Sequence, residues 1–389
     1  MYDSSITSVQ PDGNVGDLAV IFDEHRRFTA IGLYDPGSPI RIKVLHQGRP
    51  TPIDAVFWRA RLGEALAIRA ALAGSAGTTG YRVVHGENDR LPGLVLDRYD
   101  DTLVMKLYSA AWFAHLDELV PVVEDLVEPA SIVLRLARNL QAAAPPELAD
   151  GTVLRGPAPR SPLTFRENGL TFEAEVIHGQ KTGYFLDQRD NRALVRDRSA
   201  GRDVLDVFSC SGGFSVHAAA GGARLVHSVD ISAAAIAAAR RNMAHNLDRR
   251  AVRACTHEVS VGDAVPVMER LAAAGRRFDL VVIDPPSFAS QRSQIDGALH
   301  AYGRLTELAL ELMGSSGTLV QASCSSRISA RDLLGVVRAA ADRRGAGLSG
   351  VSITGHAVDH PVGFPQGEYL AAIFARVDQR PDHRRTRSA

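Results

Sequence analysis

The first third of the chain carries short apolar segments in which apolar and polar positions alternate, as they do in half-buried strands. The polar turn sequences Asp23-Glu24-His25 and Asp35-Pro36-Gly37 separate these segments. A longer stretch then places apolar residues at helical spacing, with Arg and Glu between them. The pattern predicts a small β-rich module and a following helix within residues 1–75. The predicted strands are 18–22, 28–34 and 40–44, and the predicted helix is 55–73.

A second unit, over residues 76–175, mixes strand and helix patterns. Residues 141–162 are rich in Ala, Pro and Gly and show no apolar period, which indicates an exposed excursion near a domain boundary. We therefore predict an α+β middle domain. Its predicted strands are 94–99, 103–107 and 131–136, and its predicted helix is 111–127.

From residue 201 onward, short apolar runs alternate with helical stretches. This spacing implies a parallel sheet with helices on both faces. The predicted fold class is α/β, with a Rossmann-like domain over 176–378 and a basic tail at 379–389. Ligands of such sheets bind beyond the carboxyl ends of the strands, where the strand order reverses. The predicted strands are 204–208, 225–229, 259–261, 280–283 and 318–322, and the predicted helices are 215–220, 233–246 and 264–274.

The composition is that of an ordinary globular protein and sets few limits on function. The 389 residues are 45% hydrophobic and 23% charged, which is unlike a disordered chain. The formal net charge is +0, so any positive surface for nucleic acid must be local. Apolar runs are too short for a membrane helix and residues 1–11 lack a secretory pattern, so we expect a cytoplasmic protein. The chain has three cysteines without paired spacing, which argues against a disulfide framework and a zinc site.

Each of the first four strands of the α/β region ends in groups suited to a ligand. The first leads into the small-residue turn 206–214, where the backbone can approach a bound molecule closely. Asp230 follows the second strand and can accept hydrogen bonds from both hydroxyls of a ribose. Asp263 follows the third and Asp284 the fourth. Asp230 and Asp263 taken singly are also good helix N-caps, but four successive strand ends argue against coincidence. A dinucleotide is disfavoured because the turn lacks G-x-G-x-x-G.

A thiol follows the fifth strand, in Ser323-Cys324-Ser325. This position predicts a nucleophile at the same edge as Asp284, although a lone cysteine is more often a small buried side chain. Addition of a thiolate to C6 of a pyrimidine makes C5 nucleophilic enough to attack an electrophilic methyl group. Asp284 would then engage the N3 and amino edge of the base. For Cys210 and Cys255 we expect structural roles.

These features resemble the class I methyltransferase family, which implies S-adenosylmethionine as cofactor. The resemblance narrows to the bacterial 23S rRNA (cytosine-C5)-methyltransferase family through the run Lys181 to Arg192, Phe208-Ser209-x-x-Gly-Gly-Phe214, Asp284-Pro285-Pro286-x-Phe288, Ser323-Cys324-Ser325, Asp359-His360-Pro361 and Tyr369-Leu370. It implies that Asp230 holds the ribose, Asp263 the adenine and the 206–213 turn the methionine part. It also implies that Cys324 is the nucleophile and that residues from 184 to 189 lie over the cofactor.

The resemblance further implies an N-terminal PUA-type RNA-binding module, which looks truncated here, a middle domain and a catalytic domain. The predicted catalytic residues are Cys324 and Asp284. The predicted cofactor-binding residues are Asp206, Phe208, Ser209, Ser211, Gly212, Gly213, Asp230, Ile231, Asp263, Ala264, Asp284, Tyr184, Gln188 and Arg189.

The expected partner is 23S rRNA, with no membrane and no metal, and a homodimer is left open. We expect the basic segment 181–198 to contact RNA phosphates; its basic residues are Lys181, Arg189, Arg192, Arg196 and Arg198. The tail with Arg380, Arg384, Arg385 and Arg387 is more typical of a solvated end. Three alternatives remain: a small-molecule methyltransferase derived from this family, a guanine-N7 rRNA methyltransferase, whose branch lacks the thiol, and a non-catalytic RNA-binding protein.

Overall fold

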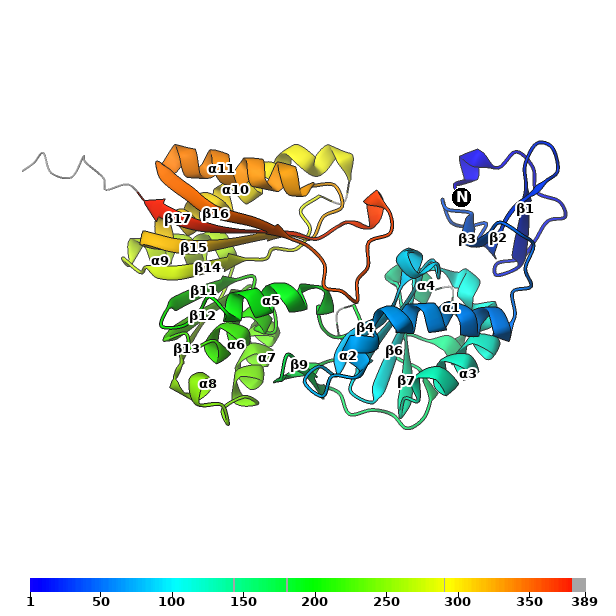
Figure 1. Cartoon of the computed structure of the whole chain (residues 1–389), viewed down its shortest axis with the longest axis horizontal. Coiled ribbons are helices and arrows are strands. Elements are labelled where there is room, and N and C mark those ends of the chain that lie inside the picture. The colour runs from blue at the N-terminus through cyan, green and yellow to red at the C-terminus, as the bar shows by residue number, and fades with distance from the viewer. Residues whose placement is uncertain (143, 180, 290, 380–389) are drawn as a thin grey trace, which may run out of the picture. The chain divides into compact units, whose positions relative to one another are not determined.

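The computed structural model describes residues 1–142, 144–179, 181–289 and 291–379, which form two compact units (Figure 1). Unit 1 comprises Met1–Gly169, Glu173–Leu186 and Val358–Gly363. Unit 2 comprises Leu170–Phe172, Asp187–Ala357 and Phe364 onward. The predicted domain boundaries at 75 and 175 stay predictions.

Unit 1 begins with a three-stranded antiparallel sheet in the order β1-β2-β3. The Asp23 carboxylate closes the β1–β2 turn, because it accepts hydrogen bonds from the backbone N–H groups of His25 and Arg27 at 2.9 Å each. The first two predicted strands are confirmed with both ends in place. The strands are β1 (Leu18–Phe22), β2 (Phe28–Tyr34) and β3 (Ile42–Gln47), followed by the helices α1 (Ala55–Ile68) and α2 (Ala70–Ala73).

A second sheet of unit 1 has five strands in the order β4-β5-β6-β7-β8. Trp58 and Trp112 are fully buried in its core, with ring centroids 5.6 Å apart. The sequence missed β4 and β8; the latter has only three residues and lies in the excursion predicted to lack structure. The elements are β4 (Gly80–His85), β5 (Leu94–Tyr99), β6 (Thr102–Leu107), α3 (Leu116–Val127), β7 (Ser131–Leu136), α4 (Arg138–Gln141) and β8 (Val153–Arg155), with β9 (Leu163–Glu167) and β10 (Leu170–Ala174) following.

A buried polar cluster fixes the segment Val358–Gly363 to unit 1, although that segment follows β16 in the chain. The Arg69 guanidinium forms a bidentate pair with the Asp89 carboxylate, at 2.8 and 2.7 Å, and also donates to the Asp359 carbonyl oxygen at 2.8 Å. The Asp359 carboxylate accepts a hydrogen bond from the Arg82 backbone N–H. Charged groups withdrawn from water in this way are tolerated only while every partner is present.

Unit 2 is built on a seven-stranded sheet in the order β13-β12-β11-β14-β15-β17-β16. The first five strands are parallel and β17 is antiparallel to both of its neighbours. Strand order reverses between β11 and β14. The strands are β11 (Asp203–Val207), β12 (Leu225–Asp230), β13 (Thr256–Val261), β14 (Phe278–Ile283), β15 (Met313–Ser323), β16 (Ala346–Thr354) and β17 (Ala371–Gln379).

Helices cover both faces of this sheet, as the alternating pattern predicts (Figure 1). α5, α6 and α7 pack on one another on one face, while α9, α10 and α11 pack on the other around the core residues Met268, Leu308 and Val337. The α/β fold class is confirmed. The helices are α5 (Arg189–Arg196), α6 (Gly213–Ala220), α7 (Ala233–Ala244), α8 (Arg250–Ala254), α9 (Ala264–Ala273), α10 (Ile295–Leu312) and α11 (Ala330–Arg344). Within the described ranges, no helix has the length and apolar character needed to cross a membrane.

The buried pair of unit 1 makes a stability prediction. Asp89→Ala leaves the Arg69 guanidinium, which is 0% exposed, without its carboxylate, so we expect a loss of about 3–5 kcal/mol in the free energy of unfolding. Asp125→Ala is the control, because it breaks the exposed Arg59–Asp125 pair and is expected to cost less than about 1 kcal/mol. Urea denaturation of both variants measures this, and equal losses would contradict it.

Candidate active site

The turn after β11 has a strained backbone. Phe208, Cys210 and Gly212 have φ angles of 63°, 48° and 77°, and a left-handed conformation is costly for a bulky residue such as Phe208. Hydrogen bonds from Ser209 N–H to the Val229 carbonyl oxygen (3.0 Å) and from Gly212 N–H to the Ser209 carbonyl oxygen (2.8 Å) hold the turn. A Cβ atom at Gly212 would lie 2.8 Å from that of Ala239. The strain lies at the switch point of the sheet, where a ligand site is expected. Because the turn begins at Phe208, β11 ends at Val207, one residue before its predicted end.

Asp206 lies under this turn, fully buried. Its Oδ2 accepts a hydrogen bond from the Ser215 hydroxyl at 2.5 Å, while Oδ1 is buried without a hydrogen-bond partner. Burial, and secondarily the charges of Asp284 and Asp230, raises the pKa of Asp206 to about 7. The Ser209 hydroxyl is likewise buried without a partner. Two unsatisfied polar atoms at a strained turn fit a polar ligand that would complete their hydrogen bonds.

The two acids after β12 and β13 differ in their surroundings. Asp230 is half-buried, and its two carboxylate oxygens accept hydrogen bonds from the backbone N–H groups of Cys210 (2.9 Å) and Ser232 (2.8 Å). Ser232, not Asp230, caps α7. Asp230 is therefore fixed against the strained turn after β11, and the helix-cap interpretation does not apply to it.

Asp263, in contrast, is exposed and is the N-cap of α9, with its carboxylate accepting a hydrogen bond from the Val265 N–H at 3.0 Å. A carboxylate that caps a helix retains free lone pairs, so its proposed contact with adenine stays a prediction. Of the residues that follow these two acids, Ile231 is 72% exposed at the same edge and Ala264 is buried.

Asp284 stands at the end of β14 and is oriented by a chain of amide side chains. Gln188 donates from Nε2 to Asp284 Oδ1 at 2.9 Å, and Asn191 donates from Nδ2 to Gln188 Oε1 at 2.6 Å. The Thr354 hydroxyl in turn donates to Asn191 Oδ1 at 2.6 Å. The sequence missed Asn191, although its spacing of three from Gln188 is that of one helix face. Gln188 therefore orients an acid of the site through a contact that the sequence did not predict.

Cys324 is half-buried after β15, and its thiol lies 3.6 Å from the Pro285 carbonyl oxygen, which follows Asp284. The parallel pairing of Ile283 with Gln321 brings these two strand ends together. Phe288, in the loop after Asp284, packs on Tyr302, with ring centroids 5.1 Å apart, and on Phe208 at 6.5 Å. Burial raises the pKa of Tyr302 to about 12, so its hydroxyl stays protonated and donates to Ser323 at 2.8 Å.

The other two cysteines, Cys210 and Cys255, have thiols whose pKa is raised by burial, to about 11 for Cys255. All three cysteines are free thiols. A thiol with a raised pKa is a poor nucleophile, in agreement with the structural roles predicted for this pair.

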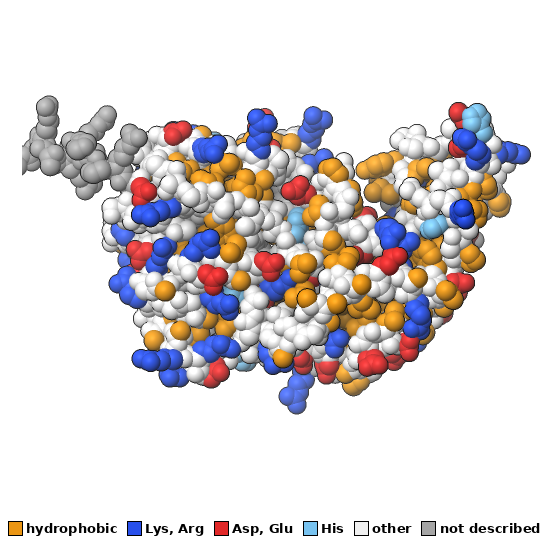
Figure 2. Space-filling model, in the orientation of Figure 1, with side chains coloured by type: hydrophobic (Ala, Val, Ile, Leu, Met, Phe, Trp, Pro, Cys, Tyr) orange, Lys and Arg blue, Asp and Glu red, His pale blue; other side chains and the backbone are white. Residues whose placement is uncertain are grey.

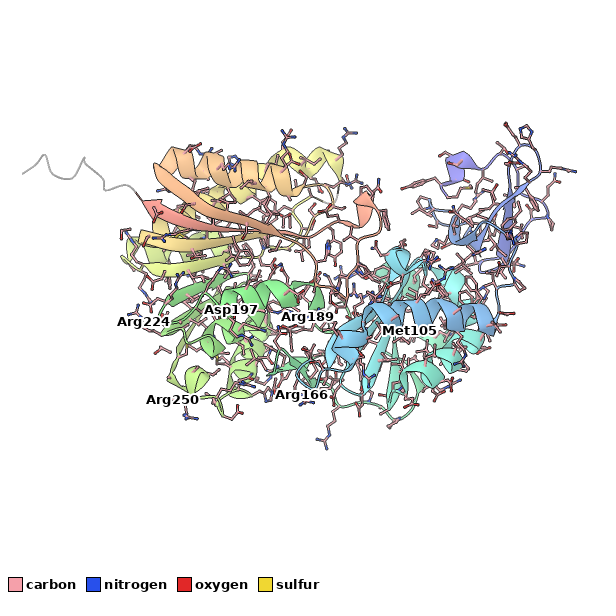
Figure 3. All side chains as sticks on the ribbon, in the orientation of Figure 1. Met105, Arg166, Arg189, Asp197, Arg224 and Arg250 are labelled. Carbon is pink, nitrogen blue, oxygen red and sulfur yellow. The ribbon has the colours of Figure 1, made fainter. Side chains whose placement is uncertain are left out.

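The structure contradicts the predicted positive surface at two of its five cations, and contact of the other three with RNA stays a prediction. Arg189 and Arg192 are buried, and Arg198 lies over the Phe374 ring, 5.2 Å from its centroid. Figure 3 shows Arg189 on α5 within unit 2, and Figure 2 shows Lys and Arg side chains mixed with Asp and Glu on the visible face. Lys181 is the one cation of the five that is exposed, while Arg196 and Arg198 are partly buried. The four tail arginines lie outside the described residues.

Arg189 and Tyr184, two further predicted cofactor contacts, are both buried. Arg189 is 2% exposed in its side chain and pairs with Asp190 at 3.3 Å. Tyr184 is buried in unit 1, where its ring packs edge-to-face on Phe165 at 5.0 Å. Their predicted position over the cofactor stays a prediction. Ser211 and Gly212 lie in the strained turn, and Gly213 is the first residue of α6.

Comparison with known proteins adds family information to this geometry. A model described as S-adenosylmethionine-dependent methyltransferase matches residues 88–349, and a model of a PUA-like domain matches residues 1–47. A ribosomal RNA large subunit methyltransferase of Deinococcus radiodurans is 46% identical over 97% of this chain and 93% of its own length. Ribosomal RNA large subunit methyltransferase I of Pseudoalteromonas translucida is 33% identical over 97% of this chain and 94% of its own.

Solved structures share the fold at low sequence identity. A methyltransferase crystallised with S-adenosylhomocysteine superposes with a TM-score of 0.79 at 20% identity, covering 94% of this chain and 93% of that chain. An S-adenosylmethionine-dependent methyltransferase from Streptococcus mutans gives a TM-score of 0.78 at 20% identity with the same coverage. These structures show the shared fold, and the family model over residues 88–349 identifies the cofactor of this chain as S-adenosylmethionine.

We predict that Asp230 contributes more to cofactor affinity than Asp263. Asp230→Ala removes a fixed, half-buried carboxylate, so S-adenosylmethionine should bind about 1.5–3 kcal/mol more weakly, the range for a hydrogen bond to a charged group. Asp263→Ala removes an exposed helix cap and should change the binding free energy by less than half of that. Calorimetry of both variants tests the assignment, and unchanged affinity in Asp230→Ala would remove it.

We also predict that cofactor affinity depends on pH through Asp206. S-adenosylmethionine carries a net positive charge and favours the ionised carboxylate, whose pKa is about 7 in the free protein. Affinity should rise by up to about tenfold per pH unit below pH 7 and level off above it. Asp206→Asn should remove this dependence. The same variant should also raise the Tm of the cofactor-free protein at pH 8, because an ionised buried carboxylate is destabilising there. A pH-independent affinity in the natural protein would contradict the prediction.

Proposed function

Since the chain belongs to the large-subunit ribosomal RNA methyltransferase family of S-adenosylmethionine-dependent enzymes, we propose that it methylates C5 of a cytosine in 23S rRNA. The observation that carries the proposal is the thiol of Cys324 beside Asp284 at the carboxyl edge of the unit 2 sheet. Methyl transfer to a nitrogen or oxygen needs no thiol at this place, whereas transfer to the weakly nucleophilic C5 does.

The cofactor supplies an electrophilic methyl group on a sulfonium. Asp230, anchored by the Cys210 and Ser232 N–H groups, would accept the ribose hydroxyls. The unsatisfied oxygens of Asp206 and Ser209 would face the methionine part, as acceptor and hydroxyl partner respectively. The strained turn presents its backbone to the same ligand without a side chain at Gly212 in the way.

In the proposed reaction the Cys324 thiolate adds to C6 of the cytosine, and the C5–C6 π electrons move toward C5 and the N3 edge. C5 would then take up the methyl group that the cofactor supplies, and the electron pair of the former sulfur–methyl bond would stay on sulfur. A base removes the C5 proton, and the electrons of that bond reform C5–C6 as the thiolate leaves. Asp284 in its protonated form would donate to N3 as negative charge develops there, and Gln188 would keep this carboxyl group in place.

A paired base in a duplex cannot present C6 to a thiol and C5 to a methyl donor together. The target cytosine must therefore be single-stranded or turned out of its stack. Tyr302 is a poor candidate for the base that accepts the C5 proton, because its buried hydroxyl, with a pKa raised to about 12, already donates to Ser323. The alternatives of guanine N7 or a small molecule as acceptor are disfavoured by Cys324, which neither reaction uses. Cytoplasmic location and homodimer formation stay predictions.

We predict that Cys324→Ala abolishes methyl transfer to 23S rRNA while leaving the affinity for S-adenosylmethionine within about twofold of the natural protein. The thiol belongs to the substrate side of the site, so its loss removes the covalent step alone. Cys210→Ala and Cys255→Ala are the matched controls and should retain activity. Transfer of a labelled methyl group, with calorimetry of the cofactor, measures all three variants.

Ribosomal RNA that contains 5-fluorocytidine should trap the natural enzyme as a covalent adduct, since fluorine at C5 cannot leave as a proton. The adduct should be visible as an RNA-linked band on a denaturing gel and absent with Cys324→Ala. Full methyl transfer by Cys324→Ala would refute the mechanism and leave the methylated atom open.

A further inference from the structure

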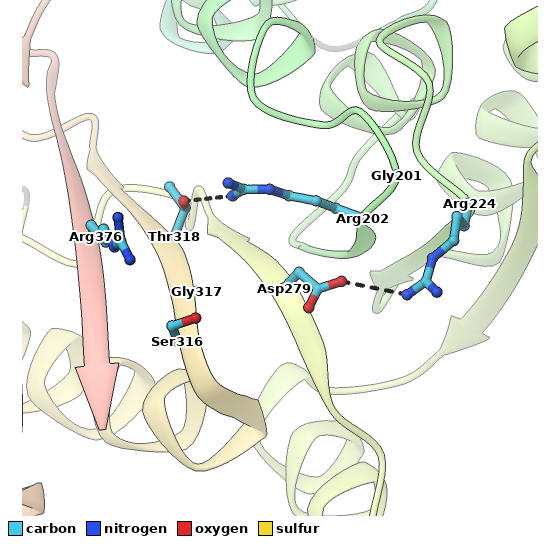
Figure 4. Close-up of a pocket in the computed structure, with 8 residues that line it drawn as sticks. All are labelled: Gly201, Arg202, Arg224, Asp279, Ser316, Gly317, Thr318 and Arg376. Carbon is cyan, nitrogen blue, oxygen red and sulfur yellow. Dashed lines mark hydrogen bonds and ion pairs between the residues drawn. The ribbon is translucent and has the colours of Figure 1, made fainter. Parts of the chain in front are cut away.

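We call residues 208–212, the strained turn after β11, the cofactor turn. A polar cavity of about 530 Å³ lies at the opposite edge of the unit 2 sheet from this turn (Figure 4). Its wall is formed at the amino ends of β11, β12 and β14, in the first part of β15 and on β17. Arg202, Arg224 and Arg376 line it together with Asp279, Ser316 and Thr318. β11 is five residues long, so the cavity is roughly 17 Å from the cofactor turn.

A break in strand register creates this cavity. Phe278 of β14 pairs with Met313 of β15, and the next pair is Leu280 with Thr318. One residue of β14, Asp279, therefore stands opposite the four residues 314–317 of β15. The extra residues of β15 bulge away from β14, and a Cβ atom at Gly317 would lie 3.0 Å from the Asp279 carbonyl oxygen. The hollow is part of the fold of the sheet rather than a gap between loose side chains.

The charges around the cavity are unevenly neutralised. Arg224 pairs with Asp203 at 3.1 Å and with Asp279 at 3.6 Å, and Arg376 pairs with Asp378 at 3.4 Å. Arg202 has no carboxylate within ion-pair distance in the described part of the chain. It reaches across the cavity and donates to the Thr318 hydroxyl at 2.7 Å, as Figure 4 shows. Arg376 lies beside the same threonine on the neighbouring strand. Arg202 thus donates to the Thr318 hydroxyl without a carboxylate partner among the described residues, whereas Arg376, at the paired position of β17, has its charge matched by Asp378.

We propose that this cavity binds a phosphate of the RNA backbone, held by Arg202 and Arg376 with the hydroxyl of Thr318. Guanidinium and hydroxyl donors match phosphate oxygens, and a planar guanidinium can bind two of them at once. Among the residues that the structure describes, the lining contains no aromatic side chain and no large apolar one. A nucleotide base would therefore find no stacking surface, whereas a sugar-phosphate segment needs none.

The proposal rests on the proposed function, because it takes ribosomal RNA as the ligand. The cavity would also supply phosphate contacts that Arg189 and Arg192 of the segment 181–198 do not offer, because both are buried. A second contact roughly 17 Å from the reacting base would fix the register of a large RNA without reading its sequence. Target choice would then remain with the catalytic edge of the sheet.

The test compares two double variants with the same loss of charge. Arg202→Gln with Arg376→Gln removes the proposed donors, and Arg250→Gln with Arg277→Gln removes two exposed arginines outside the cavity. Binding of a fluorescent 23S rRNA fragment is measured over a range of salt concentrations. The plot of log K for RNA binding against log salt has a negative slope. For the cavity variant we expect this slope to become shallower by about 0.7–0.9 for each phosphate that the variant no longer binds. The slope of the control variant should change less. S-adenosylmethionine affinity should be unchanged in both, which shows that unit 2 is folded.

Equal slopes for the two double variants would overturn the proposal. A second measurement follows the Arg202 Nε–H signal by NMR in the natural protein. The RNA fragment should shift this signal at concentrations where inorganic phosphate alone does not. A shift with inorganic phosphate that the fragment cannot compete away would assign the cavity to the free ion and overturn the RNA assignment. If the natural protein methylates the RNA while the two double variants have equal salt slopes, this inference fails and the proposed function stands. If the natural protein neither binds nor methylates the RNA, the proposed function itself is contradicted.

Discussion

The parallel pairing of β11 with β14, and of β14 with β15, decides where every reactive group of unit 2 lies. Parallel strands point their carboxyl ends to one edge, so residues far apart in the chain meet there. The cofactor turn follows β11, Asp284 follows β14 and Cys324 follows β15. The antiparallel β17 lies between β15 and the edge strand β16 of the same sheet. Because the order reverses between β11 and β14, neighbouring connections leave on opposite faces and the edge between them stays open for ligands.

Function at this edge requires interactions that destabilise the free protein. Asp206 is buried with one oxygen unsatisfied and a pKa near 7, and the charges of Asp230 and Asp284 contribute to that rise. Phe208 has a left-handed backbone conformation that few aromatic residues adopt. A cationic cofactor would neutralise the carboxylates and fill the open hydrogen bonds. Binding energy and stored strain are thus located at the same turn, which is characteristic of preorganised sites.

The sequence predicted most strands of unit 1 and the parallel strands of unit 2, because their apolar runs are bounded by clear turns. It did not predict α5, α10, α11, β16 or β17. It also placed Arg189 and Arg192 on a positive surface, whereas both are buried. Their spacing with Val195 is that of one buried helix face. The Gln188–Asp284 hydrogen bond joins residues 96 positions apart, and the arginine-lined cavity depends on a register break. Such features arise from tertiary pairing and have no local pattern in the sequence.

The central claim is that this fold directs a methyl group to C5 of one cytosine in ribosomal RNA. Mass spectrometry of nuclease fragments of 23S rRNA, from a strain that lacks the gene, tests it most directly. The account predicts that one fragment loses the mass of a single methyl group, that 5-methylcytidine disappears from it, and that the natural gene restores the modification while the Cys324→Ala gene does not. An unchanged set of fragments, or the loss of a methyl group from a purine, would contradict the account.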